Sequence, residues 1–466
     1  MAAVNHSKTL PGGARIFRAD NGSGVLLRDL EKRAELPMVW ALDERMRLAS
    51  RPLTATYHVG EAYAFSIRLA SGRVVEATAD SELRTLLGWS PVGTLSVGDR
   101  VAVPRRVPGP LNPQPMAPDE LILLAHMIGD GSSVKNQPIR YASIDEQNLY
   151  AVTNAARHFG VTAKRDDYAA ARVTTLRLPA PYRLTHGVRN PIAAWLDELG
   201  LFGKRSYEKF VPAEVFATPN DRVSLFLGHL WATDGCVIWD GKQGQGRIYY
   251  GSTSRRLIDD VRQLLLRFGI ASRVYRVPKT GYRDCFHLYI QGARNQIRFL
   301  NIVDVNGEKY FAGREILKNL NVVKANENVD TVPREVWDLV RQDLKDQGMS
   351  HRAFSTAMRI KFCGSTMWKH SPSRTRLHRA AAILDDRGLH DLTTNDVFWD
   401  KIVEINSAGQ QDVYEVAVGG ADNIVAQGIP MRTPTVAVDA SNPSEVASVQ
   451  RRPLPSRTNC TCRDLR

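Results

Sequence analysis

Two short stretches of the sequence resemble each other, and both end in Asp-Gly. The first is Leu-Leu-Ala-His-Met-Ile-Gly-Asp-Gly at 123–131, and the second is Leu-Gly-His-Leu-Trp-Ala-Thr-Asp-Gly at 227–235. Each is an apolar run with two small residues four positions apart, a spacing that puts side chains on one helical face. The small residues are Ala125 and Gly129 in the first run and Gly228 and Ala232 in the second. The repeat predicts two helices whose backbones approach closely along these faces.

Each predicted helix ends in an acid. Glycine is the residue that most easily ends a helix, so both helices are expected to stop at the Asp-Gly pair. Asp130 and Asp234 then lie at helix C-termini, where the helix dipole already carries partial negative charge. A divalent cation would remove this electrostatic cost. The pattern therefore predicts a pair of helices that delivers two carboxylates to one metal site.

The residues after each run repeat a second pattern. In both halves the run is followed by strand-like sequence, then by a helix with 3.6-residue apolar periodicity that ends in Phe-Gly, and then by another strand. The helices are expected at 145–160 and 254–270, and the strands at 139–143, 173–178, 247–253 and 285–290. This internal duplication predicts an α+β domain over residues 118–320, with two pseudo-symmetric halves and the Asp-ending helices at the axis.

The two stretches resemble the dodecapeptide motif of LAGLIDADG homing endonucleases, with both copies in one chain. The resemblance implies halves of the ββαββα type and metal-dependent hydrolysis of phosphodiester bonds in double-stranded DNA. It implies Mg²⁺, replaceable by Mn²⁺, held by Asp130 and Asp234 and by Gly129 and Thr233. Two unequal halves in one chain imply a monomer that recognises a long, asymmetric site.

Lysines are the other expected catalytic groups. The segment 203–212 resembles a block that carries an active-site lysine in homing endonuclease inteins, and Lys209 matches it. Such a lysine can position water or stabilise phosphate charge. Lys204 is a weaker candidate and, with Arg205, is expected to contact DNA; Lys279 has a plausible symmetric place. Each of these could instead be a solvated loop residue. His126 and His229 are interpreted as packing or polar contacts.

Residues 10–107 and 396–434 have the short alternating runs and Gly-containing turns of β structure. They resemble the two halves of an intein Hint domain, closest to inteins of the bacterial replicative DNA helicase. The resemblance predicts an endonuclease domain inserted into an all-β domain. The splicing positions, however, depart from the family pattern, and a chain unable to splice is expected. These positions hold Thr9, Thr78, Ser81, Arg432 and Thr433, followed by Pro434.

Residues 332–390 are predicted to form a small helical module similar to a helix-turn-helix. Its expected DNA-binding residues are Lys361, Lys369, Arg374, Arg376 and Arg379. A solvated helical linker is the alternative. Residues 1–9 are expected to form an N-terminal extension, and residues 435–466 are expected to form a disordered tail.

Composition is consistent with a nucleic-acid partner, since the formal net charge is +13. No apolar run reaches the about 18 residues of a membrane-spanning helix, and five cysteines do not form a disulfide framework. A bacterial cytoplasmic protein, nucleoid-associated when bound to DNA, is expected. Two other functions stay open: a DNA-binding remnant that no longer cleaves, and residual intein-type autoprocessing.

Overall fold

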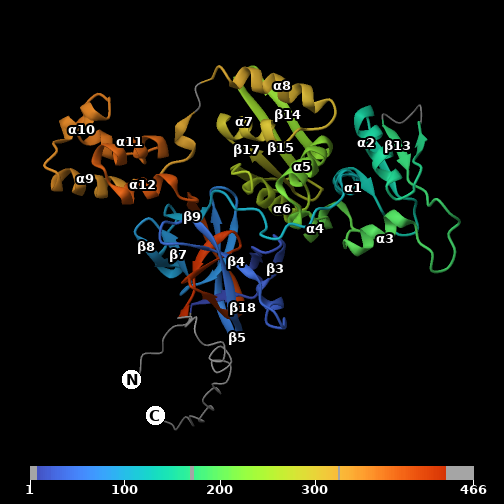
Figure 1. The fold of residues 1–466 in the computed structure, drawn as a ribbon, viewed down its shortest axis with the longest axis horizontal. Helices are drawn as coiled ribbons and strands as arrows, with labels where there is room; N and C mark the ends of the chain where they lie inside the picture. Colours follow the sequence, from blue (N-terminus) through green and yellow to red (C-terminus); the bar gives the residue numbers. More distant parts are fainter. Residues whose placement is uncertain (1–7, 168–172, 324–325, 437–466) are drawn as a thin grey trace, which may run out of the picture.

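The computed structural model describes residues 8–167, 173–323 and 326–436. They form a β domain (residues 9–104 with 397–436), a central domain (118–320) and a helical module (332–395), as Figure 1 shows. Of the predicted extension (1–9) and tail (435–466), residues 1–7 and 437–466 lie outside the described residues. Thr9 begins strand β1, and Thr435–Val436 form a strand paired with β18, so the predicted disorder is wrong at 435–436. Within the described part of the chain, no helix is long and apolar enough to cross a membrane.

Two long strands, β5 (Leu48–Leu69) and β18 (Val397–Gly419), organise the β domain. They pair antiparallel from Ile402 opposite Leu69 to Val418 opposite Leu53. The first comes from the N-terminal segment and the second from the C-terminal segment, so the two segments form one domain and the rest is an insertion. The other strands are β1 (Thr9–Pro11), β2 (Arg15–Phe17), β3 (Gly24–Leu26), β4 (Met38–Leu42), β6 (Val74–Thr78), β7 (Glu82–Thr85), β8 (Gly88–Pro91), β9 (Arg100–Pro104), β19 (Asn423–Ala426), β20 (Ile429–Arg432) and β21 (Thr435–Val436).

The central domain consists of two halves with the same strand arrangement. The sheet orders are β10-β11-β13-β12 and β14-β15-β17-β16, and the pairings within each sheet are antiparallel. The first half contains α1 (Pro118–Gly129), β10 (Gly131–Ser132), β11 (Arg140–Ser143), α2 (Glu146–Arg157), β12 (Lys164–Asp166), β13 (Thr174–Arg177) and α3 (Pro191–Glu198). The second contains α4 (Ala213–Ala217), α5 (Asn220–Asp234), β14 (Gly235–Asp240), β15 (Gln245–Ser252), α6 (Arg255–Leu266), β16 (Ser272–Val277), β17 (Cys285–Ile290), α7 (Ala293–Ile302) and α8 (Lys309–Leu320). The predicted pseudo-twofold α+β architecture is confirmed.

One continuous core unites the two halves. Apolar side chains of α1 and α5, including Leu124, Ile128, Leu227 and Trp231, belong to the same buried cluster. Because a helix pair that shares a core cannot separate without exposing it, α1 and α5 hold the two sheets in a fixed relation. The same packing fixes the ends of α1 and α5 and the aspartates that lie there.

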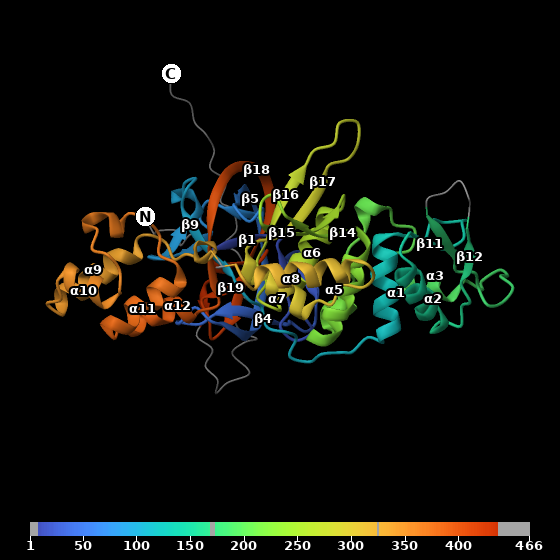
Figure 2. The same ribbon diagram turned by 90° about the horizontal axis from the view of Figure 1, so that it is seen from above.

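The helical module lies at one end of the molecule, and the half containing α1, α2 and α3 lies at the other (Figures 1 and 2). Its helices are α9 (Val336–Asp346), α10 (His351–Ala357), α11 (Arg374–Leu384) and α12 (Arg387–Thr394). Trp337, Phe354 and Leu377 are buried at its centre. Ser350 caps α10 because its hydroxyl accepts a hydrogen bond from the Ala353 amide at 3.2 Å.

The β domain is bonded directly to the second half of the central domain. Asp260 on α6 is fully buried, forms an ion pair with Arg15 of the β domain and accepts a hydrogen bond from the Val211 amide at 3.0 Å. The Val274 amide donates to the carbonyl of Ser71 at 2.8 Å. These contacts orient the second sheet relative to the β domain.

Candidate active site

The helices α1 and α5 meet most closely just before their aspartates. A Cβ placed on Gly129 would come within 2.1 Å of the Thr233 hydroxyl oxygen, so only glycine fits there. The prediction that Gly228 lies on the face of α5 that approaches α1 was wrong. A Cβ on Gly228 would meet the carbonyl oxygen of Asp304 at 2.3 Å, so this glycine admits the 304 loop and not the other helix. The partner-facing position of α5 is Thr233, because it precedes Asp234 as Gly129 precedes Asp130.

Two histidines form a polar contact between the helices. His126 Nε2 lies 3.1 Å from His229 Nδ1, and His126 Nδ1 lies 3.0 Å from the Tyr141 hydroxyl. Burial lowers the pKa of His126 well below its ordinary value and lowers the pKa of His229 to about 4. Both rings are therefore neutral at neutral pH. They act as the packing and polar contacts expected from the sequence.

Asp130 follows α1, and Asp234 is the last residue of α5. Both residues are exposed at the helix ends, but the surrounding protein removes part of their hydration. This desolvation, with repulsion from Asp234, raises the pKa of Asp130 to about 6. Desolvation also raises the pKa of Asp234. The two carboxylates are thus neighbours whose simultaneous ionisation is costly, and a divalent cation between them would relieve the cost.

The donor set at the helix ends suits a hard cation. No group of three or more His, Cys, Asp or Glu side chains among the described residues is arranged to hold a metal ion. A cation would therefore depend on Asp130 and Asp234, with backbone carbonyl, water or phosphate oxygens completing its coordination. Mg²⁺ binds in this way, through one or two carboxylates and several waters.

One lysine binds the C-terminal carbonyls of each helix: the buried Lys209 at α1 and the partly buried Lys309 at α5. Lys209 Nζ donates to the carbonyls of Met127 and Ile128 at 2.9 Å and of Gly131 at 2.9 Å. Lys309 Nζ donates to those of Ala232 at 2.8 Å and Thr233 at 2.6 Å. Each ammonium offsets the negative end of a helix dipole. Desolvation lowers the pKa of Lys209 to about 8 and also lowers that of Lys309, while the aspartates oppose both shifts.

Lys309, and not Lys279, is thus the counterpart of Lys209. Lys279 lies in the turn between β16 and β17, where its carbonyl accepts a hydrogen bond from the Tyr282 amide at 3.0 Å. The sequence contains two signals for the correct residue. Lys209 follows Asp130 by 79 residues and Lys309 follows Asp234 by 75, and both lysines stand in a Glu-Lys-aromatic triplet.

The raised pKa of Asp130 leads to a prediction about stability in metal-free buffer. The folded protein binds this proton more tightly than the unfolded chain, whose carboxyl has the ordinary pKa of 3.8. Protonation of Asp130 therefore adds stability that is fully present below about pH 4 and is lost as the pH rises through about 6. Asp130→Asn should stabilise the protein relative to the wild type at pH 7 and less so at pH 5, measured by thermal unfolding in EDTA. An equal difference at both pH values would contradict the shift.

The outer faces of the two sheets differ in chemistry. Arg140, Arg177 and Lys164 lie side by side across the first sheet and are exposed, while the neighbouring Tyr141 and Leu176 are buried. In the second sheet the corresponding row holds Tyr249, Tyr289 and Arg273, and the Tyr249 and Tyr289 rings are 4.8 Å apart. One half thus presents guanidinium and ammonium groups, and the other presents mainly aromatic rings.

The other expected DNA-binding residues lie apart from the helix ends. Lys204 and Arg205 are exposed ahead of the short 3-10 turn Ser206–Glu208. Lys361, Lys369 and Arg379 are exposed on the helical module. Arg376 is partly buried, with its guanidinium 5.4 Å from the centre of the Trp337 ring.

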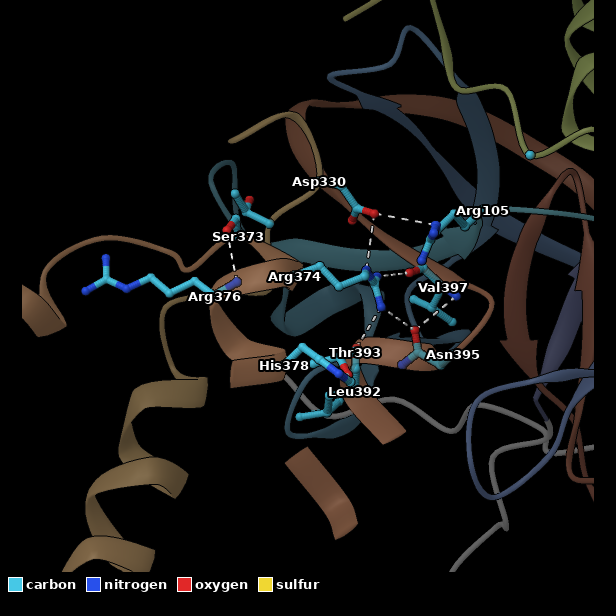
Figure 3. A network of polar contacts seen from close by, with 12 residues as sticks. Arg105, Asp330, Ser373, Arg374, Arg376, His378, Leu392, Thr393, Asn395 and Val397 are labelled. Carbon is cyan, nitrogen blue, oxygen red and sulfur yellow. Dashed lines mark hydrogen bonds and ion pairs between the residues drawn. The ribbon is translucent and has the colours of Figure 1, made fainter. Parts of the chain in front are cut away.

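Arg374 does not fit the prediction of a phosphate contact. Only 8% of it is exposed, and its guanidinium donates to the carbonyls of Leu392 at 2.7 Å and Val397 at 2.5 Å (Figure 3). It also pairs at 3.2 Å with Asp330, which lies 3.4 Å from Arg105, the residue that follows β9. Its basic neighbours in the sequence suggested DNA, but the structure uses Arg374 to fasten the helical module to β18.

Arg374→Met should therefore act on stability. It leaves two carbonyls without their charged donor, and a hydrogen bond to a charged group typically contributes about 1.5–3 kcal/mol. Asp330 keeps its ion pair with Arg105. We expect a lower unfolding midpoint, read from the tryptophan fluorescence of the module. Arg379→Met, at an exposed site on the same helix, is the control. Equal midpoints for the two variants would show that the network does not fasten the module.

The expected splicing positions come together in the β domain. Ser81 Oγ donates to the Thr9 carbonyl at 2.8 Å and lies 2.9 Å from the Thr78 hydroxyl oxygen. Glu82 forms ion pairs with Lys8 at 2.9 Å and with Arg432 at 3.3 Å. The two junction regions, more than 400 residues apart in the chain, are thus side by side. Thr433 is fully buried beside them, and its amide donates to the Asp422 carbonyl at 2.7 Å.

Comparison with known families decides the assignment of the central domain. The family described as the LAGLIDADG-like domain matches residues 221–304, which include α5 from its second residue, Asp234 and the whole second sheet. Residues 221–304 are thus similar to a LAGLIDADG-like domain. The family resemblance predicted from the sequence is confirmed, and the match falls on the second of the two similar halves.

Similarity extends over most of the chain. The replicative DNA helicase DnaB of Synechocystis sp. is 33% identical over 440 residues, which are 92% of this chain and 50% of the helicase. The chain spans about half the length of the curated relatives it matches. Such a match agrees with the resemblance to helicase inteins.

Two solved structures correspond to parts of the chain. A DnaB intein from Synechocystis sp. PCC 6803 is 28% identical and covers 21% of this chain and 69% of the intein, with a TM-score of 0.20. I-DmoI in complex with DNA and Mn is 15% identical and covers 40% of this chain and 96% of that protein, with a TM-score of 0.28.

Proposed function

We propose that the protein is a site-specific double-strand DNA endonuclease of intein origin that requires a divalent cation. Mg²⁺ is the proposed ion, with Mn²⁺ able to replace it. One observation supports this most strongly: Asp130 and Asp234 are neighbours at the ends of two packed helices, where desolvation and repulsion from Asp234 raise the pKa of Asp130 to about 6. A protein does not retain two mutually destabilising carboxylates at one point for stability.

The residues at the helix ends have complementary roles in this proposal. Asp130 and Asp234 would hold the cation, and the carbonyls of Gly129 and Thr233 lie beside them. When bound, the cation supplies charge neutralisation at the scissile phosphate and a lower pKa of coordinated water. Lys209 and Lys309 keep a positive charge beside each carboxylate and hold the helix-end carbonyls in place. Together they would stabilise negative charge that develops on the phosphate.

The substrate proposed is a long, asymmetric DNA duplex bound by a monomer. The two halves are fixed by a common core, so their sheets contact one duplex together. Arg140 and Lys164 on the first sheet suit phosphate oxygens, whereas Tyr249 and Tyr289 on the second suit apolar base edges and sugars. Since the two surfaces differ, a palindromic site would satisfy only one of them.

We also propose that the β domain no longer splices. Acyl shift needs a strong nucleophile and an activating base, and asparagine cyclisation needs a carboxamide. Thr9, Ser81 and Thr433 supply hydroxyl groups at these places, and Arg432 supplies a guanidinium. The hydroxyl of Ser81 is engaged with the Thr9 carbonyl, which makes it a structural hydrogen bond.

The test is incubation of the purified chain with a plasmid that carries an uninterrupted replicative-helicase gene. We expect one discrete double-strand cut with Mg²⁺ or Mn²⁺ and none with EDTA. The same gel separates the alternatives. Retarded but uncut DNA would favour a binding remnant, and shorter protein fragments would reveal autoprocessing.

A further inference from the structure

A cleft of about 420 Å³ lies where three parts of the molecule meet. Its walls come from the turn between β5 and β6, from β9 and the start of β18, from α6 and β16, and from the segment that leads to the helical module. The volume is in the range of small-molecule sites and is too small for a duplex. The cleft is separate from the helix ends of the candidate active site.

Positive charge dominates the lining of this cleft. Its cationic side chains are Arg73, Arg100, Arg105, Arg262, Arg273 and Lys401, and its carboxylate is Asp400. Arg105 is paired with Asp330 and Arg262 with Asp259. Among the described residues Arg73 forms no ion pair within 4.0 Å, although Asp400 and Asp259 are near enough to act on its charge. Arg100 donates to the neutral hydroxyl of Thr331 at 2.8 Å. The cleft therefore carries cations in excess of the acids that surround them.

Arg73 is the most unusual member of this group. Only 8% of it is exposed, and its Nη1 donates to the Gln427 carbonyl at 3.2 Å while Nε has no partner. Arg262 beside it is 5% exposed, and its Nη1 is also without a partner. A guanidinium removed from water is costly unless an anion accompanies it. Arg262 has Asp259 as its anion, whereas Arg73 forms no ion pair among the described residues, so Arg73 together with the neighbouring Arg100 points to a bound anion.

The remaining lining limits what the anion can be. Asp400 Oδ1 accepts hydrogen bonds from the amides of Ser71 at 3.2 Å and Lys401 at 2.9 Å, while its Oδ2 has no partner. This carboxylate could accept a hydrogen bond from a ligand hydroxyl or amine. Phe398 and Trp399 contribute apolar surface to the wall of the cleft. The indole N–H of Trp399 is a buried donor without a partner. The cleft thus combines sites for an anion, a polar hydrogen and a flat apolar group.

We propose that this cleft binds a small organic phosphate of about the size of a nucleoside monophosphate, with Arg73, Arg262 and Arg100 as the residues that recognise its phosphate. Such a ligand would touch the β domain, the LAGLIDADG domain and the segment before the helical module at once. Its binding would therefore strengthen the connection among the three parts, because a ligand that needs all three stabilises their joined arrangement.

Calorimetric titration of the full chain with AMP, inorganic phosphate and adenosine tests the proposal. We expect AMP to bind one-to-one, phosphate to bind more weakly and adenosine not to bind. Arg100→Gln should weaken AMP binding by about tenfold or more, as expected for the loss of a hydrogen bond to a charged group. Arg100 is partly exposed, so its replacement should leave the fold intact. Arg73→Met tests the buried site, and Arg33→Gln, at an exposed position outside the cleft, is the control.

The outcomes separate the possible sources of the phosphate. Equal affinity for AMP and inorganic phosphate would support a phosphate site without a nucleoside subsite. Binding of adenosine as tightly as AMP, or no binding of any of the three probes, would overturn the proposal. So would a loss of duplex DNA binding in Arg100→Gln and Arg273→Gln without any AMP binding in the wild type, since the charges would then serve the DNA backbone.

Discussion

Asp130→Asn should abolish DNA cleavage and leave DNA binding in place. Asparagine has the shape of aspartate but no negative charge, so the proposed cation loses one of its two charged ligands. We expect the cleavage rate with Mg²⁺ to fall by at least about 100-fold. Mutation of residues that only hydrogen-bond a metal ligand typically costs about 10–100-fold, and loss of a ligand itself should cost more. The sheet residues that would contact DNA, such as Arg140 and Tyr249, are unchanged. The duplex should therefore still be retarded on a gel.

Two variants complete this experiment. Asp119→Asn, in the first turn of the same helix, removes the same charge away from the helix ends and should cleave like the wild type. Asp234→Asn should match Asp130→Asn, because the two aspartates are neighbours. Full activity of Asp130→Asn would reject the proposed catalytic site while leaving the fold assignment untouched.

Lys309→Met should impair cleavage strongly, and Lys279→Met should not. Lys309 Nζ is bonded to the carbonyls of Ala232 and Thr233 and sits beside both aspartates, whereas Lys279 lies in a hairpin turn. Removal of a group that stabilises transition-state charge typically costs about 10²–10³-fold in rate. Lys209→Met should resemble Lys309→Met, since Lys209 has the same place at α1.

Stability must be measured with these rates, because each lysine also binds the end of a helix. Lys309→Arg keeps the charge, and partial recovery of its cleavage would separate charge from capping. If Lys279→Met lost activity and Lys309→Met kept it, the symmetry-based assignment of the lysines would be wrong. A similar fall for both would point to a shared effect on DNA binding.

The fold was largely predictable because it is built on a duplication. Two apolar runs ending in Asp-Gly, each followed by strands and an amphipathic helix, define the halves, and the alternating segments at the ends define a β domain. These patterns are local, and the burial of apolar faces follows from them. The carboxylates Asp130 and Asp234 could be found in the same way, because helix-ending glycines mark their positions.

Other features depended on tertiary contacts. The Gly228 error arose because a glycine four residues from an alanine indicates a close approach but not the partner, which is the Asp304 carbonyl. Arg374 stands among basic residues like a phosphate ligand, yet the pairing of its helix with Asp330 and β18 buries it. Lys309 differs from Lys209 in that no family-like block marks it in the sequence, and its place is indicated by its similar distance from the preceding aspartate and by the same Glu-Lys-aromatic triplet. The Hint resemblance placed Thr9, Thr78 and Ser81 in one group, and the structure brings them together.

The pairing of β5 with β18 also has a consequence for synthesis on the ribosome. Leu69 cannot pair with Ile402, its partner in the sheet, until more than 300 further residues have been translated. At about 5–20 residues per second this delay lasts on the order of tens of seconds, ample time for the inserted LAGLIDADG domain to fold first. The nuclease part is then complete before the scaffold that carries it can close. We therefore expect nascent chains stalled before residue 397 to contain a protease-resistant central domain and an open N-terminal β segment.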